Sequence, residues 1–329
     1  MLIMIYFIFS QVNNVSFGKI SPEQFLSRIK SGNCIICPAL GEDDAVLKLN
    51  KKYLVIHSDP ITESGLDSGF LSVVVACNDV NMKGTACKWV LTTVLLSRED
   101  NLNNIIDGIN EACSLIGCNV VGGHTEVVDI NRDIVVTTAL GETDKIMEIN
   151  SVKDGDYVVL IGDIGIEGSW ILATQFQSLL RSKGVSDEVI EAAKAFKKEL
   201  IVQSKALAIS RLVKFMHDTT DGGLLQALFE LAKRSNMTVS IREDSIPLRR
   251  EVHEVTAALN IDPLKFISSG AFIAITDNPK EILSKVNGYI IGKLVKGEPI
   301  VKTEKRIIND NVKEELARIE NSYNGWWKR

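Results

Sequence analysis

The segment FLSVVVACNDVNMKGTAC, residues 70–87, combines an apolar run with an abruptly polar end. The apolar residues predict a buried helix over 67–77, directly followed by Asn78 and Asp79. An amide and a carboxylate in this position either bond to local backbone or hold a ligand. The other acidic clusters of the chain decide between these two alternatives.

The composition is that of a soluble globular protein. The chain has 329 residues, 45% hydrophobic and 24% charged, which is enough for one large or two ordinary domains. Its formal charge is -5, and it has no long run of Lys or Arg. This balance argues against a nucleic-acid or anionic-membrane partner and favours a small ligand held by a few polar groups. We expect a cytoplasmic protein.

The first residues, MLIMIYFIFS, are apolar but lack the basic region and cleavage site of a signal peptide. They also fall short of the roughly 20 residues that cross a membrane, so no stable membrane insertion is expected. The segment could be an extra strand, an interfacial or partner-binding segment, or extra residues that result from a start codon assigned too far upstream. We favour an ordered apolar arm over residues 1–20, packed on a neighbour.

The six cysteines are too few and too scattered for a disulfide scaffold. Cys34 and Cys37 form a C-x-x-C motif without a second pair, and are interpreted as ordinary loop or core thiols. The remaining four lie among apolar residues and are predicted to be small core residues: Cys77, Cys87, Cys113 and Cys118.

Two α+β units are predicted, rather than a doubly wound βαβ series. A polar linker near residue 150 precedes a strand and a glycine loop, and divides the chain into domains 21–150 and 151–302. The charged tail, 303–329, is expected to be helical and to end in Trp326 and Trp327. Pro22 predicts a helix over 22–30, and the two strand-like runs 45–50 and 53–59 predict a hairpin.

Acidic or glycine-rich clusters recur at four junctions between predicted elements. They are GEDDAV with Asp43 and Asp44, HSDP with Asp59, NDVNMKG with Asn78 and Asp79, and VGGHTEVV with Gly122, Gly123, His124, Thr125 and Glu126. Taken singly, each is compatible with an ordinary turn. Taken together, carboxylates without matching Lys or Arg would repel one another unless Mg²⁺ bound them and bridged nucleotide phosphates. Neither a P-loop nor a G-x-G-x-x-G motif is present.

The order and spacing of these clusters resemble the PurM-like ATP-binding superfamily. Its members include aminoimidazole ribonucleotide (AIR) synthetase, thiamine-monophosphate kinase, selenophosphate synthetase and the hydrogenase maturation factor HypE. The resemblance covers roughly residues 17–300, and the GGHTE variant is similar to archaeal AIR-synthase-related or HypE-like proteins. Seven segments in order carry it: GEDDAV, IHSDP, CNDVNMKGT, VVGGHTEVV, KDGDYVVLIGDIGIEGSWIL, HDTTDGGLLQALFELA, and SSGAFIAI with GYIIGKLV.

The resemblance implies a two-domain α+β fold that binds ATP and Mg²⁺. The N-terminal domain would form a β-barrel across a homodimer, and the C-terminal domain would be α/β. The implied catalytic residues are Asp79, His124 and Asp218, and the implied magnesium ligands are Asp43, Asp59 and Asp79. The implied nucleotide-binding residues are Asp43, Asp44, Asn78, Gly122, Gly123, Thr125, Asp221, Gly222 and Gly223. The last two glycines would open a helix whose free N–H groups suit an anion.

Two histidines keep alternative interpretations. His124 replaces the acid of the common G-G-[DE]-T motif, and either bonds a neighbouring carboxylate or contacts phosphate. His217, beside Asp218, has the same two alternatives, with the structural one favoured.

The reaction implied by the resemblance is ATP-dependent activation of a carbonyl, amide or phosphate oxygen on a small-molecule or protein-tail acceptor. HypE carries its carbamoyl group on a C-terminal cysteine, whereas the last cysteine here is Cys118. We therefore do not expect HypE's own dehydration in its usual form. The alternatives are a hydrogenase-maturation-type partner that acts on another protein, and a non-catalytic nucleotide-binding scaffold.

Overall fold

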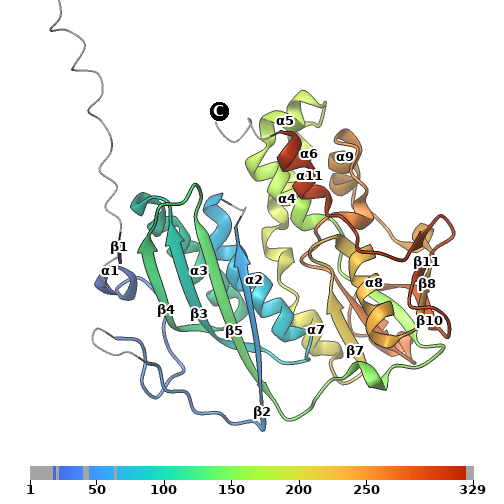
Figure 1. The fold of residues 1–329 in the computed structure, drawn as a ribbon, viewed down its shortest axis with the longest axis horizontal. Coiled ribbons are helices and arrows are strands. Elements are labelled where there is room, and N and C mark those ends of the chain that lie inside the picture. Colours follow the sequence, from blue (N-terminus) through green and yellow to red (C-terminus); the bar gives the residue numbers. More distant parts are fainter. Residues whose placement is uncertain (1–17, 20–21, 40–43, 63–64, 324–329) are drawn as a thin grey trace, which may run out of the picture.

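Two β-sheets lie side by side in the computed structural model, each with helices packed on it (Figure 1). The structure describes residues 18–19, 22–39, 44–62 and 65–323. The predictions made for residues 1–17, Asp43, Trp326 and Trp327 therefore lie outside the described residues. Among the described helices, none has the length and apolar character needed to cross a membrane.

The first sheet has five strands in the order β1-β4-β3-β5-β2. Their bounds are β1 Gly18–Lys19, β2 Tyr53–Ile61, β3 Cys87–Leu96, β4 Asn119–Val127 and β5 Ile134–Thr143. β3 and β4 are parallel, and the other neighbours are antiparallel. α2 (Ser68–Asn81) and α3 (Leu102–Ile116) cover one face, and the opposite face is turned to the viewer in Figure 1.

The second sheet has seven strands in the order β12-β11-β8-β10-β6-β9-β7. Their bounds are β6 Tyr157–Ile161, β7 Phe215–Asp218, β8 Thr238–Ile241, β9 Phe272–Thr276, β10 Gly288–Val295, β11 Val301–Lys302 and β12 Ile307–Ile308. All neighbours are antiparallel except β8 and β11. The mixed, mainly antiparallel sheets confirm the predicted α+β class.

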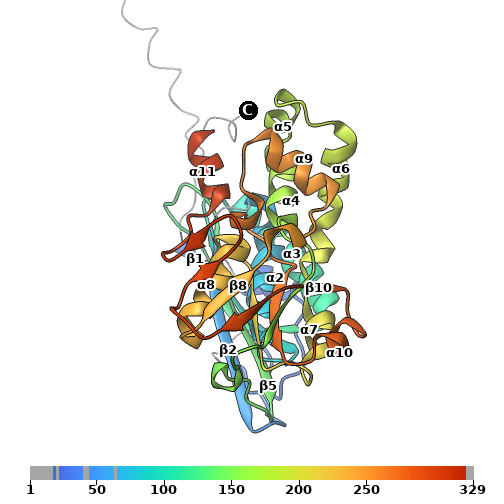
Figure 2. The same ribbon diagram turned by 90° about the vertical axis from the view of Figure 1, so that its right-hand side faces the viewer.

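Most helices of the second half lie together at one end of the molecule. α4 (Ile166–Gln175), α5 (Gln177–Ser182), α6 (Asp187–Lys194) and α9 (Arg250–Ala258) gather at one end in both ribbon views, with α11 (Glu315–Ser322) beside them (Figures 1 and 2). The others are α7 Gln203–Ile209, α8 Gly223–Ser235 and α10 Pro279–Leu283.

One hydrophobic core joins the two halves of the molecule. It runs from Phe70 on α2 and Ile105 on α3 to Trp170 on α4 and Phe196 beyond α6, all at most 1% exposed. Burying each such side chain contributes roughly 1.5–3 kcal/mol, so this shared core fixes α2 against the second half. α2 also contacts β7, which places the end of α2 at the boundary between the two sheets.

The predicted hairpin of 45–50 with 53–59 is wrong. β2 pairs along its whole length with β5, and residues 45–50 form only the isolated bridge between Ile36 and Val46. The turn before β2 is instead held by Glu142 of β5, which accepts the backbone N–H groups of Asn50 and Lys51. The partner strand of β2 is thus β5, in which Thr138 pairs with Ser58, and the local sequence around β2 does not indicate so distant a partner.

Three further local predictions are corrected or confirmed. The first helix, α1, ends early, at Pro22–Leu26. Cys34 and Cys37 are not ordinary thiols, because they are joined in a disulfide. The other four cysteines are at most 2% exposed, which confirms that they belong to the core.

Candidate functional site

The end of α2 meets the edge of the first sheet. The sequence predicts that the helix ends before Asn78 and Asp79. In the structure, α2 extends through Asn81, so both residues lie in its last turn. On β2, His57 and Asp59 are two residues apart and therefore share a face, the one turned toward α2. The Nε2 atom of His57 lies 3.3 Å from Oδ2 of Asp79.

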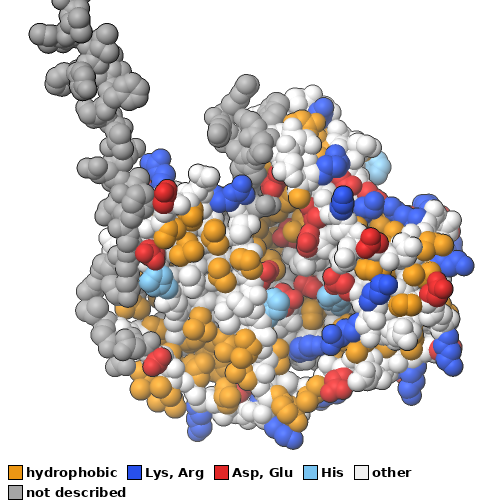
Figure 3. Space-filling model, in the orientation of Figure 1, with side chains coloured by type: hydrophobic (Ala, Val, Ile, Leu, Met, Phe, Trp, Pro, Cys, Tyr) orange, Lys and Arg blue, Asp and Glu red, His pale blue; other side chains and the backbone are white. Residues whose placement is uncertain are grey.

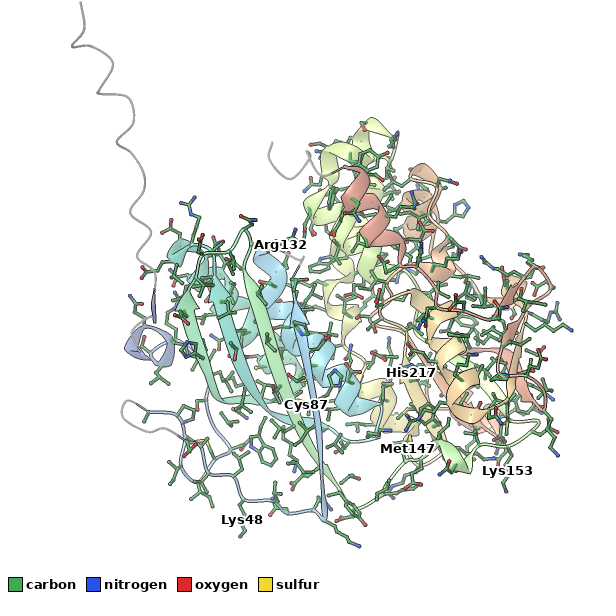
Figure 4. The ribbon with its side chains drawn as sticks, viewed as in Figure 1. Lys48, Cys87, Arg132, Met147, Lys153 and His217 are labelled. Carbon is green, nitrogen blue, oxygen red and sulfur yellow. A yellow bond between two sulfur atoms is a disulfide. The ribbon has the colours of Figure 1, made fainter. Side chains whose placement is uncertain are left out.

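The second sheet contributes the end of β7 to the same place. The His217 ring contacts Asp218 through Nδ1 (3.4 Å) and Glu230 of α8 through Nε2 (2.6 Å). Figure 4 shows His217 at the boundary between the two halves of the molecule. Asp218 is buried, and within the described part of the chain its Oδ2 atom has no hydrogen-bond partner. A buried, unpaired carboxylate oxygen is costly unless something else binds it.

Asp59, Asp79 and Asp218 are close enough to perturb one another; we call them the acid cluster. Burial, followed by repulsion from Asp218 and Asp59, raises the pKa of Asp79 to about 8. Burial and the charge of Asp218 also raise the pKa of Asp59, although His57 opposes the shift. Three carboxylates, from β2, α2 and β7, thus compete for one small volume, and a bound cation would relieve their repulsion.

Among the described residues, the ion-pair partners of Asp79 and Asp218 are histidines. Burial opposes protonation of His217, but its hydrogen bonds to Asp218 and Glu230 outweigh burial and raise its pKa to about 9. His217 is therefore an imidazolium at neutral pH. Figure 3 shows acidic and histidine side chains gathered in the hollow between the two halves.

Glu167, in the first turn of α4, is a further buried acid near the cluster. It is 2% exposed and accepts the backbone N–H of Ser269 at 2.8 Å. Burial raises its pKa to about 7, opposed by the bond to Ser269 and assisted by the charges of Glu314 and Asp218. The carboxyl can therefore hold or release a proton near neutral pH.

Asn78 joins the two halves of the molecule. Its side chain is 2% exposed, donates to the carbonyl of Leu200 (2.8 Å) and accepts the N–H of Val202 (3.2 Å). Both ends of the amide are therefore used by backbone of the segment before α7. The geometry favours a positioning role for Asn78, which anchors the turn of α2 that carries Asp79, over the predicted direct contact with nucleotide.

The glycine pair of VVGGHTEVV lies within one continuous strand, β4, and not in a turn between two strands. Gly123 has φ +150°, and a Cβ there would lie 2.0 Å from the carbonyl oxygen of Thr92 on β3. The missing side chain thus accommodates the neighbouring strand. Thr125 is buried and pairs with Val94, a residue of the core beneath α2 and α3.

His124 lies on the other face of the sheet. It pairs with Thr93, and both line a cavity of about 830 Å³ together with Gly122 and the exposed Asp44. Its Nε2 atom lies 3.3 Å from Glu126. Alternate residues of a strand point to opposite faces, so His124 points away from the face that α2 covers. Within one chain, the structure therefore does not bring His124 to Asp79 and Asp218.

Asp221, Gly222 and Gly223 lie where β7 leads into α8. Asp221 is exposed and lines a hollow of about 270 Å³ together with Asp218 of the acid cluster and His217. Gly222 is the N-cap of α8, with φ +70°, and a Cβ on Gly223 would lie 2.7 Å from the Phe266 carbonyl. Both glycines are thus required by the backbone, and they place the start of α8 next to Asp218.

The sequence analysis missed His57, Glu167 and Glu230. The alternation of β2 was a usable signal for His57, because His57 and Asp59 must share a face of the strand. Glu167 and Glu230 lie inside two of the segments that carry the resemblance, but only the fold shows that their side chains reach the site.

Comparison with known proteins defines the class. The sequence pattern of the "AIR synthase related protein, N-terminal domain" matches residues 41–143, and that of the "AIR synthase related protein, C-terminal domain" matches residues 153–303. The chain belongs to the AIR synthase related family, in the PurM-like, HypE-like group that its motifs resemble.

Individual relatives agree with this assignment. A putative hydrogenase expression/formation protein of Methanocaldococcus jannaschii is 30% identical over 244 residues, which cover 70% of each chain. The thiamine-monophosphate kinase of Pyrococcus horikoshii is 27% identical over 82% of this chain and 87% of the relative. Among solved structures, hydrogenase maturation protein HypE in complex with ATP has a TM-score of 0.68 and 23% identity, and covers 85% of this chain and 90% of that one.

Proposed function

We propose that this protein binds ATP with Mg²⁺ at the acid cluster, and uses it to phosphorylate or otherwise activate a carbonyl, amide or phosphate oxygen of an acceptor. The observation that carries the proposal is the convergence of Asp59, Asp79 and Asp218 from the two halves of the molecule. Within the described part of the chain, the buried Oδ2 atom of Asp218 has no hydrogen-bond partner. Oxygen-only ligand sets of this kind suit a hard divalent cation.

The relatives support the nucleotide part of the proposal. A HypE structure with the same fold was solved in complex with ATP, and another relative is a thiamine-monophosphate kinase. Sites of this type act chiefly by positioning and electrostatics, with metal ions neutralising charge on the phosphates. That requirement matches the absence of Lys and Arg among the ion-pair partners described for Asp79 and Asp218.

Each residue of the cluster has a proposed task. Asp59, Asp79 and Asp218 would hold Mg²⁺, and Mg²⁺ would supply charge neutralisation on the phosphates. His217 orients Asp218 through the 3.4 Å contact, while Glu230 keeps His217 protonated. Asn78 fixes the turn of α2 that carries Asp79. Asp221, Gly222 and Gly223, close to Asp218, remain proposed nucleotide contacts. Asp44, Gly122 and Gly123 lie at the cavity of His124, so their proposed contact is with a nucleotide bound by a second copy of the chain.

A second candidate function keeps the ATP site but makes the acceptor another protein. The relative from M. jannaschii, a putative hydrogenase expression/formation protein, favours it. Capture of a partner through a C-terminal cysteine, in the presence of Mg²⁺ and ATP, would support this version. Release of ADP with a small carbonyl or amide compound alone would support the first.

Nucleotide binding should depend on pH because Asp79 must lose its proton to bind a cation. With a pKa of about 8, Asp79 is mostly protonated at pH 7 and mostly ionised at pH 9. We expect the affinity for Mg²⁺ with a non-hydrolysable ATP analogue to rise about tenfold from pH 7 to pH 9. Isothermal titration calorimetry measures this. Affinity that was equal at both pH values, or equal with and without Mg²⁺, would contradict the proposal.

The uncovered face of the first sheet supports a homodimer. Apolar side chains gather over this face in Figure 3, and Ile56 and Leu91 on it are 57% and 38% exposed. Such a patch on a soluble protein usually marks an interface. We propose that two copies pack through it, which would cover the cavity that contains His124.

Replacing Ile56 by Lys is expected to weaken the dimer at least about tenfold, because it buries a charge in an apolar interface. The matched control is Ile307→Lys, an equally exposed isoleucine (59%) on β12 of the second sheet, which should leave the dimer intact. Light scattering coupled to size-exclusion chromatography gives the masses. A monomeric parent protein, or two variants that behave alike, would refute the assignment of this face.

A further inference from the structure

Four cysteine thiols converge in the core of the first half, away from the acid cluster. They come from α2 (Cys77), the start of β3 (Cys87), α3 (Cys113) and the link from α3 to β4 (Cys118). All four are free, and at most 2% of each is exposed. The six cysteines of the chain thus divide into one disulfide and one buried group of four.

The sulfur atoms are in mutual reach. Those of Cys77, Cys87 and Cys118 all lie within 4.8 Å of one another, and the Cys77 and Cys87 sulfurs are 2.6 Å apart. Cys113 adjoins Cys118: hydrogen bonds from the thiols of Cys113, Cys77 and Cys87 lower the pKa of Cys118. The thiol of Cys113 therefore lies beside the group formed by the other three.

We propose that Cys77, Cys87, Cys113 and Cys118 bind one Zn²⁺ ion as a closed structural site. Four thiolates select soft or borderline metals, and zinc takes four sulfur ligands in tetrahedral geometry. Zinc–sulfur bonds of about 2.3 Å would hold the sulfurs roughly 3.8 Å apart, within the 4.8 Å that spans the sulfurs of Cys77, Cys87 and Cys118. Binding would separate Cys77 and Cys87 slightly and draw Cys113 in.

A hollow in the first half of the molecule reaches one of the four cysteines, Cys87. This hollow of about 590 Å³ is lined by Cys87, Lys88 and Gln203, and Cys34 of the disulfide lies on its wall. Gln203 also accepts the backbone N–H of Cys87 at 3.0 Å and donates to the carbonyl of Ile116. The segments that carry the thiols are thus already held together by hydrogen bonds before a metal enters.

The proposed ion would stabilise the first half and, through it, the acid cluster. Cys77 directly precedes Asn78 and Asp79 in the last turns of α2. An ion shared by α2, α3 and the starts of β3 and β4 would fix that turn against the sheet. Metal removal should therefore lower the melting temperature of the whole chain.

The test uses the full-length, untagged chain, purified anaerobically, without a thiol reductant and without added metal. Elemental analysis should find about one zinc per chain. After exchange in Co²⁺, the absorption spectrum should show thiolate-to-cobalt charge-transfer bands and the intense visible bands of tetrahedral coordination. Cys118→Ala should lose both signals, whereas the control Cys34→Ala/Cys37→Ala, which removes the other cysteine pair, should keep both.

Two results would overturn the proposal, and both are read on the parent protein, so they stand even if Cys118→Ala does not fold. One is that the protein contains no zinc and shows no cobalt bands, while the four thiols all react with a thiol reagent after unfolding. The four cysteines would then be ordinary core residues. The other is a second disulfide, between Cys77 and Cys87, found by mass spectrometry after alkylation of the free thiols.

Discussion

Replacing Asp79 by Asn is expected to lower the affinity for a magnesium–ATP analogue at least about 100-fold, and at the same time to stabilise the free protein. The loss follows because Asp79 is a proposed ligand, and an amide oxygen cannot replace the charge of a carboxylate on Mg²⁺. The gain follows because Asp79 is partly buried among Asp59 and Asp218, so its own charge is unfavourable there. Sites that trade stability for function behave in this way.

The stability effect has a definite sign. The pKa of Asp79 is about 8 in the folded state, against 3.8 for an unperturbed Asp, so the folded state holds the proton more tightly. As pH rises from about 4 to 8, the unfolded state is therefore stabilised by ionisation of Asp79 while the folded state keeps the proton, and the parent protein loses stability. Without Mg²⁺ at pH 8, the free energy of unfolding of Asp79→Asn should be about 1–3 kcal/mol higher than that of the parent protein. This difference should vanish below about pH 4, where the parent carboxyl is protonated in both states.

Calorimetry and urea unfolding measure the two effects. Asp100→Asn is the matched control, because Asp100 is an exposed acid whose ion pair is with Arg98, in the same half of the chain. It should change neither quantity. Unaltered nucleotide affinity in Asp79→Asn would remove Asp79 from the site, and a loss of stability would show that the carboxylate is not under repulsion.

Replacing Gly123 by Ala should destabilise the fold by about 3–5 kcal/mol. A Cβ at this position would lie 2.0 Å from the Thr92 carbonyl oxygen, and φ is +150°. Overpacking against rigid backbone and the unfavourable φ each cost about 1–3 kcal/mol. Urea unfolding followed by tryptophan fluorescence gives the free energy.

Gly155→Ala is the control for Gly123→Ala. Gly155 also has a positive φ, +88°, but nothing lies within 4 Å of its Cβ position, so only the backbone term of about 1–2 kcal/mol applies. If Gly123→Ala instead folded as stably as the control and lost only nucleotide binding, the glycine would serve the ligand, as its motif suggested, and not the strand pairing.

Much of the fold was predictable because its signals are local. The apolar run before Asn78 predicted α2, and Pro22 predicted the start of α1. The wrong hairpin shows the limit: β2 pairs with β5, about 80 residues further on, and short-range turn signals cannot show such a partner. The fold class survived that error because the family motifs fixed the order of elements.

The sequence predicted which types of residue form the site, but not how their side chains are arranged. Asp59 and Asp79, two of the three predicted magnesium ligands, lie near each other, and Asp218, predicted as catalytic, joins them. The third predicted ligand, Asp43, lies outside the described residues, and the ligand roles remain proposals. His124 lies on the opposite face of the sheet, and Asn78 bonds backbone from the second half. Neither fact follows from spacing, because the face of a strand depends on register, and the partner of Asn78 is over 120 residues away in sequence.

The central claim is that acids from both halves of the molecule hold one Mg²⁺–triphosphate. Titration of the parent protein with a non-hydrolysable ATP analogue at pH 9, with and without Mg²⁺, tests it most directly. We predict binding of one nucleotide per chain that requires Mg²⁺ and disappears in Asp218→Asn. Binding that was equally strong without Mg²⁺, or no heat in either titration, would contradict the account.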